Sequence, residues 1–200
     1  MKLSDFAFFT LGEPIREFSE FDCGRKEINQ FFQNNALDYQ NELFSKTYLL
    51  SPQNNLGKIA AAFTVANTCL FTRMLPNSRK KKVGYEVRHS KGPINYPAIL
   101  LGQLGVDAHF AGHGLGAQII EFVAQWFSSR ENKSGCRYLI VEAYNEDRLL
   151  SFYASCGLKP VFNDVEQERI YRHIDNDGKP LETRLLYRDL ILFRRKSIRT

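Results

Sequence analysis

The sequence predicts an α/β protein of the α+β kind, in which helices cover both faces of a central mixed sheet. Its 200 residues, of which 44% are apolar and 24% charged, suit a single globular domain, 1–200. Strand-like runs dominate before position 106, and helix-like and strand-like runs alternate after it. A glycine-rich run joins an apolar strand to an amphipathic helix between these two parts, and we expect the domain to be organised around it.

The order of the elements follows from changes in the spacing of apolar residues. The first part reads as a strand, two short amphipathic helices and a β-hairpin. A strand at 97–106 is apolar on both faces, and we expect the strand after the next helix to lie parallel to it. The polar segment 164–183 predicts a loop with a turn at 176–178. In chain order, the expected elements are strand 6–11, helices 22–36 and 34–44, strands 46–51, 58–71 and 97–106, helix 116–128, strand 136–143, helix 145–156, and strands 158–162 and 184–192.

Composition and charge limit the class of protein and of partner. A net charge of +5 favours a polyanionic partner. The four cysteines lack the close spacing of metal sites, so we expect no metal, and free thiols in a reducing compartment. The first residues do not resemble a secretion signal, and no apolar run reaches the ~20 residues of a membrane helix. We therefore expect a cytoplasmic protein with no membrane partner.

A basic segment, about 76–92, interrupts the strand pattern. Arg79 to Lys82 form one group of charges, and Arg88, His89 and Lys91 form a second. One interpretation is a solvated loop, because runs of charge keep loops in water. The other is a basic flap beside the site of a phosphate-bearing substrate. The sequence leaves both open.

Three glycines, Gly112, Gly114 and Gly116, form the turn between the central strand and the helix that follows. Glycine lets backbone N–H groups approach a phosphate without an intervening Cβ, and the helix N-terminus adds partial positive charge. The turn therefore predicts a cradle for a pyrophosphate. Taken alone it also fits the dinucleotide fingerprint, with Glu142 as the ribose-binding acid. The several strands before the turn, and the short chain after it, argue against a dinucleotide domain.

Three stretches resemble a known family. The acetyl-coenzyme A signature of the GNAT acetyltransferase superfamily, Gln/Arg-x-x-Gly-x-Gly/Ala, is similar to Ala111-Gly112-His113-Gly114-Leu115-Gly116, which follows Val106-Asp107. The second motif of that superfamily resembles Asn145 to Leu158, with Phe152-Tyr153 at its centre. The opening Phe21-Asp22-Cys23-Gly24 with the helix at 28–32, and the strand at 96–104, are similar to the acetyltransferase toxins of bacterial toxin–antitoxin modules.

This resemblance implies a fold and a coenzyme. The GNAT fold has a mixed, mostly antiparallel sheet of six to seven strands, splayed here between 97–106 and 136–143, and a coenzyme-binding core at about 97–162. Acetyl-coenzyme A would place its pantetheine arm along the end of the central strand and its pyrophosphate in the glycine turn. Ala111 replaces the Gln or Arg of the family, so phosphate binding would rest on backbone N–H groups and His113. The implied coenzyme-binding residues are Leu104, Val106, Ala111, Gly112, His113, Gly114, Leu115, Gly116, Ala117 and Asn145.

Tyr153 is the candidate general acid. Acetyl transfer to an amine needs a proton for the departing thiolate, and a phenol, with a pKa of about 10, is protonated at neutral pH. The alternative reading of Tyr153 is a core aromatic beside Phe152, and that of Asn145 is a helix cap. No carboxylate is an evident general base, since Glu142 and Asp107 read as structural or solvated acids. An α-amine, with a pKa of about 7.7–8.0, would tolerate this absence.

The sequence therefore predicts an N-acetyltransferase that moves an acetyl group from acetyl-coenzyme A to a primary amine by direct attack. An aminoacyl-tRNA is the leading acceptor, because its phosphates would meet the basic segment and the basic tail at 194–196. Two alternatives remain: an acetyltransferase for a small amine, peptide or protein terminus, and a non-catalytic coenzyme A-binding module. An antitoxin protein and a second copy of the chain are the further candidate partners.

Overall fold

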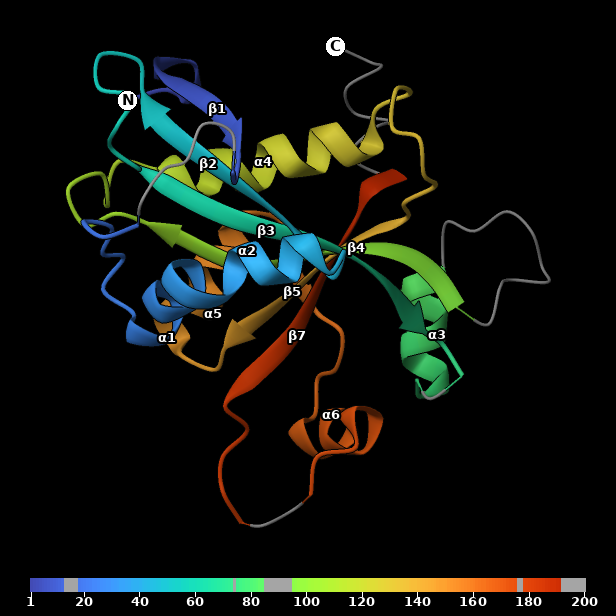
Figure 1. Ribbon diagram of the computed structural model, residues 1–200. Coiled ribbons are helices and arrows are strands. Elements are labelled where there is room, and N and C mark those ends of the chain that lie inside the picture. The colour runs from blue at the N-terminus through green and yellow to red at the C-terminus, as the bar shows by residue number, and fades with distance from the viewer. Residues whose placement is uncertain (13–17, 74, 85–94, 176–177, 192–200) are drawn as a thin grey trace. The chain divides into compact units, whose positions relative to one another are not determined.

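The computed structural model describes residues 1–12, 18–73, 75–84, 95–175 and 178–191 (Figure 1). Within these residues seven strands form one sheet in the order β1-β2-β3-β4-β5-β7-β6. The pairs β1–β2, β2–β3, β5–β7 and β6–β7 are antiparallel. The predicted class is confirmed. The strands are β1 (Phe6–Thr10), β2 (Lys46–Pro52), β3 (Ala61–Phe71), β4 (Asn95–Val106), β5 (Tyr138–Tyr144), β6 (Lys159–Pro160) and β7 (Thr183–Asp189).

Helical segments connect these strands. The chain forms two compact units. The first unit consists of Met1–Asn67 and Leu100–Trp126, and the second unit consists of Thr68–Ile99 and Phe127–Thr200. Strands β3 and β4 contribute residues to both. The helical segments are η1 (Leu3–Asp5), α1 (Lys26–Gln30), the π-helical η2 (Phe31–Asn35), α2 (Ala36–Asn41), α3 (Asn77–Gly84), α4 (Leu115–Ser128), α5 (Asp147–Ser155) and α6 (Val165–Arg172).

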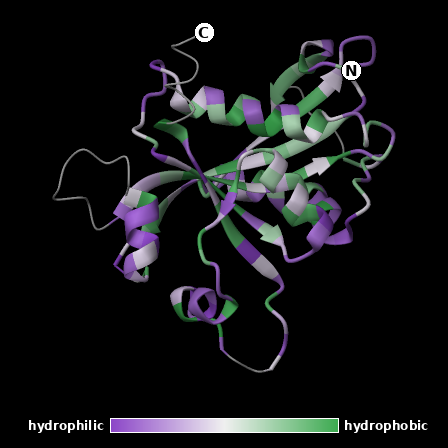
Figure 2. Cartoon of the chain, turned by 180° about the vertical axis from the view of Figure 1, so that it is seen from behind, coloured by the Kyte–Doolittle hydropathy of each residue, from purple (hydrophilic) through white to green (hydrophobic). Residues whose placement is uncertain are grey.

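In the first unit, helices lie on both faces of β1, β2 and β3. Figure 1 shows α2 in front of these strands and α4 behind them. Five consecutive residues of β2, from Thr47 to Ser51, are buried, as expected for a strand covered on both sides. Helix α4 contributes Ile119, Ile120 and Val123 to the core, all fully buried, and its polar and apolar residues lie in separate patches along the helix (Figure 2).

The predicted pair of helices at 22–36 and 34–44 is instead one continuous helical stretch from Lys26 to Asn41, interrupted by the π turn η2. Its buried residues, Ile28, Phe32 and Ala36, lie four positions apart. On an uninterrupted α-helix this spacing drifts around the axis. A π turn holds more residues than an α turn, and so it returns all three side chains to the same face.

In the second unit, β5 and β7 pair along their full length, from Tyr138 opposite Asp189 to Tyr144 opposite Thr183. Tyr138 is fully buried and its hydroxyl donates to the Val83 carbonyl at 2.6 Å, which fixes helix α3 to the strand. The sequence left a solvated loop and a basic flap both open for the basic segment. Its part Asn77–Gly84 is helical, and 85–92 lies outside the described residues. Arg88, His89, Lys91 and the basic tail also lie outside them.

Arg79 of helix α3 binds the chain at β6 and just beyond it. Its guanidinium is buried, with Nε donating to the Val161 carbonyl at 2.5 Å and Nη2 donating to the Pro160 carbonyl. Its Nη1 donates to Asn163 Oδ1 at 3.0 Å. The predicted strand 158–162 is shorter in the structure and consists of Lys159 and Pro160.

Helix α6 lies where a polar loop was predicted. Asp164 caps it, accepting the N–H of Glu166 at 2.9 Å. Its buried face carries Glu168 and Arg169, with 0% and 5% exposure, so no apolar periodicity marks it. The Glu168 carboxylate accepts Arg184 Nε at 2.7 Å and the Leu185 N–H at 2.5 Å, which attaches α6 to β7.

The described residues contain no helix that is long and apolar enough to cross a membrane. They hold all four cysteines, each half-buried, and none of the four is in a disulfide.

Glu168→Gln is expected to lower the free energy of unfolding by about 3 kcal/mol, because it removes the buried carboxylate that pairs with the half-buried charge of Arg184. Urea denaturation followed by circular dichroism measures the change. Glu166 is the matched control on the same helix: its carboxylate is 59% exposed and lies 3.7 Å from Arg169. Glu166→Gln is expected to cost less than about 1 kcal/mol. Equal losses in the two variants would contradict the role assigned to the buried carboxylate.

Candidate functional site

The end of strand β4 directs its backbone groups to two sides. The N–H of Asp107 donates to the Ala60 carbonyl at 2.9 Å, and that of Gln103 donates to Thr64 Oγ1 at 2.9 Å. Backbone groups of successive strand residues alternate in direction. Those of Leu104 and Val106 therefore face away from β3. This orientation suits hydrogen bonds to an extended ligand, such as the pantetheine arm that the sequence predicted here.

The glycine turn lies beyond β4, after residues 107–111, and presents N–H donors that have no partner among the described residues. Gly112 and Gly114 have φ values of +78° and +77°, in the region that side chains disfavour, and a Cβ at either would meet no atom within 4 Å. Helix α4 begins at Leu115, whose buried side chain anchors the turn to the core. The N–H groups of residues 112–117 donate to no other residue that the structure describes. The arrangement can hold an anion at the helix N-terminus.

The side chains around the turn offer few polar groups, and position 111 lacks the polar side chain that the family has there. Ala111 and His113 are both exposed. Ala111 has no group that could bond a phosphate, and the His113 side chain bonds no residue within the described part of the chain. Of the residues that the resemblance implied at this turn, those at 112–117 therefore offer their backbone, with His113 the only polar side chain among them.

Asp107 is a structural carboxylate at the base of the turn. It is 1% exposed, and it accepts the N–H of Asp22 at 3.2 Å and the N–H of His109 at 3.0 Å. The imidazole of His109 lies against the same carboxylate, with Nδ1 2.8 Å from Oδ1. His109 was not among the predicted site residues, although an Asp-x-His spacing shortly before a glycine turn is a signal that could have indicated it.

In the second unit, Tyr153 lies on helix α5 and is half-buried. Its ring contacts that of Phe152, with 5.1 Å between centroids. Burial raises the pKa of the Tyr153 phenol to about 12, and the Cys156 thiol adds to the rise. The hydroxyl is therefore protonated at neutral pH and can donate a hydrogen bond.

Asn145 precedes the same helix and is exposed. Its Nδ2 donates to the Leu181 carbonyl at 2.9 Å and its N–H donates to the Glu182 carbonyl at 2.8 Å. Glu146 occupies the N-cap position of α5, so Asn145 is not the cap that the alternative interpretation proposed. Its side-chain oxygen accepts no hydrogen bond from the described residues, and so could accept one from a ligand.

The other ionisable candidates have separate roles. Glu142 accepts hydrogen bonds from Arg172 and, at 2.7 Å, from the Thr183 hydroxyl, which ties β5 to α6 and β7. It is a structural acid, in line with the sequence interpretation. On α3, the buried Arg79 is a structural cation, whereas Lys80, Lys81 and Lys82 are exposed on a strongly hydrophilic helix (Figure 2). The basic group of the sequence thus divides into one buried anchor and three exposed charges.

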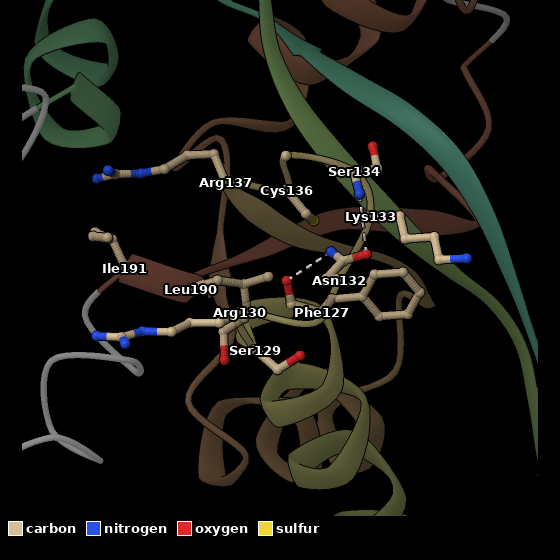
Figure 3. Close-up of a pocket in the computed structure, with 12 residues that line it drawn as sticks. Phe127, Ser129, Arg130, Asn132, Lys133, Ser134, Cys136, Arg137, Leu190 and Ile191 are labelled. Carbon is tan, nitrogen blue, oxygen red and sulfur yellow. Dashed lines mark hydrogen bonds between the residues drawn. The ribbon is translucent and has the colours of Figure 1, made fainter.

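A cavity of about 380 Å³ in the second unit contains none of the predicted site residues (Figure 3). Arg130, Lys133 and Arg137 line it, together with Asn132, Ser134 and Cys136. Arg130 and Arg137 extend toward one side in Figure 3, and Lys133 points the opposite way. Arg137 also forms an ion pair with Asp189 at 2.7 Å. Because the three cations do not converge, this cavity is not the candidate site.

No protein-family model matches the chain. Several solved structures do. A tyrosine-to-phenylalanine variant of KacT has a TM-score of 0.71 at 18% identity, over 96% of this chain and 98% of that chain. AtaT complexed with acetyl-methionyl-tRNAfMet has a TM-score of 0.71 at 20% identity, over 95% and 98%. A variant of the AtaT toxin bound to acetyl-coenzyme A and the C-terminus of the antitoxin AtaR has a TM-score of 0.65 at 20% identity, over 94% and 98%.

These similarities extend over nearly the whole of both chains. They confirm the fold that the sequence predicted from its resemblance to acetyltransferase toxins. The chain therefore has the fold of KacT and AtaT.

Proposed function

We propose that the protein is an acetyl-coenzyme A-dependent N-acetyltransferase whose acceptor is the α-amine of an aminoacyl-tRNA. The glycine turn at the start of α4 carries the proposal. Its positive φ values and its unpaired N–H groups suit a pyrophosphate, and it follows a strand whose terminal backbone groups suit a pantetheine arm. The fold supports this reading, since AtaT, which shares it, has been solved with acetyl-coenzyme A.

The donor would be held largely by main chain. Leu104 and Val106 would bond the amide groups of the pantetheine arm, as a neighbouring strand would. The backbone from Gly112 to Ala117 would hold the pyrophosphate, and the exposed Asn145 oxygen would accept a hydrogen bond from the coenzyme. The thioester supplies the acetyl group, and no metal is part of the proposal.

The reaction is a direct attack. The amine nitrogen forms a bond to the acetyl carbonyl carbon, the C–S bond breaks, and the sulfur leaves with the electron pair as a thiolate. The nitrogen then loses a proton to solvent. Tyr153 assists this departure by directing its phenolic hydrogen to the sulfur.

The pKa of Tyr153 determines how that hydrogen is used. A simple thiol titrates near 8.5, so complete transfer from a phenol of pKa about 12 would be uphill by about 5 kcal/mol. The hydrogen therefore stays mainly on oxygen and stabilises the thiolate through a charge-assisted hydrogen bond. The same high pKa keeps the hydroxyl protonated across the physiological range.

The choice of acceptor follows from the two carboxylates that were considered as general bases. Asp107 and Glu142 are both engaged in structural bonds, so the amine must be largely neutral on its own. An α-amine, with a pKa of about 7.7–8.0, meets this condition, and a lysine, at about 10.4, does not. The exposed Lys80, Lys81 and Lys82 would contact the phosphates of a tRNA. The AtaT complex with acetyl-methionyl-tRNA supports this acceptor, and the AtaT complex with AtaR supports an antitoxin as a protein partner.

Tyr153→Phe is expected to lower turnover about 100-fold while the Kd for coenzyme A stays unchanged, because only the hydrogen bond to the leaving sulfur is lost. Thiol release from acetyl-coenzyme A in the presence of methionyl-tRNA measures turnover, and calorimetry measures binding. Tyr39→Phe, at a tyrosine that is 46% exposed, is the control and should leave both unchanged. Full turnover in Tyr153→Phe would exclude Tyr153 as the acid.

Gly112→Ala is expected to destabilise the protein by about 1 kcal/mol, since alanine disfavours a positive φ. It should also raise the Kd for coenzyme A at least tenfold, because the new Cβ projects into the open side of the turn. Gly135→Ala is the matched control: its φ is not positive and a Cβ there meets no atom within 4 Å. Coenzyme binding that survives Gly112→Ala unchanged would place the pyrophosphate elsewhere.

Replacing Lys80, Lys81 and Lys82 together by Gln is expected to weaken binding of methionyl-tRNA and to flatten its dependence on salt. Each lost phosphate contact lowers the slope of log K against log salt by about 0.7–0.9. Filter binding over a range of salt measures the slope, and acetylation of a small amine by the same variant controls for general damage. A slope equal to that of the wild type would exclude a tRNA bound through α3.

A further inference from the structure

Asp107 and His109 form a fixed pair between β4 and the glycine turn. The carboxylate side chain is 1% exposed and the imidazole side chain is 73% exposed, with 2.8 Å between Oδ1 and Nδ1. An ionised carboxylate only accepts hydrogen bonds, so the contact places a proton on Nδ1. The opposite ring nitrogen, Nε2, has no partner within the described residues, and most of the ring is exposed. A buried acid thus orients an exposed imidazole.

The backbone around the pair is held on several sides. The N–H of Phe110 donates to the Asp107 carbonyl at 2.8 Å, and the N–H of Ala108 donates to the Asp22 carbonyl at 2.8 Å. The Phe110 ring packs edge-on against Phe6, with 5.9 Å between centroids, and Lys58 Nζ lies 5.5 Å from its centroid. His109 therefore occupies a defined position, three residues before Gly112, and is not on a loose loop.

We propose that His109 contacts a phosphate of the acetyl-coenzyme A through Nε2, and that Asp107 is its positioning residue. The inference rests on the proposed function. Ala111 removes the side chain that the turn was expected to supply, and His109 is the polar side chain nearest in sequence whose ring is held in place. On binding, Nε2 takes up a proton from solvent and donates it in a charge-assisted hydrogen bond to a phosphate oxygen.

The position of His109 favours a phosphate contact over a role as general base. The pantetheine arm is proposed to run along Leu104 and Val106, and the phosphates to lie in the turn that begins at Gly112. Along the chain His109 lies between them, three residues after Val106 and three before Gly112, whereas the thioester would lie at the other end of the arm. An imidazole at this place meets the phosphate end of the coenzyme.

The test compares two ligands by calorimetry, coenzyme A and pantetheine, which lacks the phosphates. His109→Ala is expected to raise the Kd for coenzyme A about tenfold and to leave that for pantetheine unchanged, as one charge-assisted hydrogen bond predicts. The turnover number with acetyl-coenzyme A is measured on the same variant. His173→Asn, at an exposed histidine of the second unit, is the control and should change neither Kd.

The outcomes separate this inference from the proposed function. A wild-type protein that binds no coenzyme A overturns both. Wild-type binding that His109→Ala leaves intact, or a turnover number that falls at unchanged Kd, overturns the phosphate contact alone. Nitrogen NMR of the His109 ring tests the role of Asp107 in the intact protein. A proton on Nδ1 is expected. A neutral ring with its proton on Nε2 would overturn the positioning role of Asp107.

Discussion

The buried carboxylate of Asp107 is the interaction on which the candidate site of the first unit depends. A carboxylate removed from water persists only where its oxygens accept hydrogen bonds. Those bonds come from the N–H groups of Asp22 and His109 and from the His109 ring. One side chain therefore fixes the end of β4, the segment around Asp22 and the entry to the glycine turn. The donors at the start of α4 keep their direction because the chain that leads into them is held.

Buried charges have a similar role in the second unit. The guanidinium of Arg79 holds the carbonyls of Pro160 and Val161, five and six residues beyond the end of the helix that carries Tyr153. Glu168 holds Arg184 and attaches α6 to β7. Breaking such contacts costs more than breaking exposed pairs, because an unpaired charge remains in a site that water does not reach. Residues that look solvated in the sequence thus organise the surroundings of the proposed acid.

Features with a local cause were predictable. The central strand is apolar on both faces, and the glycine turn reflects backbone conformations that few other residues adopt. Helix α6 was not predicted, because its buried face carries Glu168 and Arg169 and so gives no apolar period. The π turn at Phe31–Asn35 was missed for a related reason: packing of Ile28, Phe32 and Ala36 on one face selects it, and local propensity does not.

The sequence by itself determined which chemical groups the candidate site contains. These are glycines that expose backbone donors, a tyrosine at the proposed acid position, and an alanine where a polar side chain was expected. Only the tertiary structure decided which polar groups remain available to a ligand. Asp107 bonds a residue 85 positions away and Arg79 bonds one 82 positions away, so neither partner is visible in local sequence. The physical reason is that a buried polar group must be paired, and its partner is set by how distant segments pack.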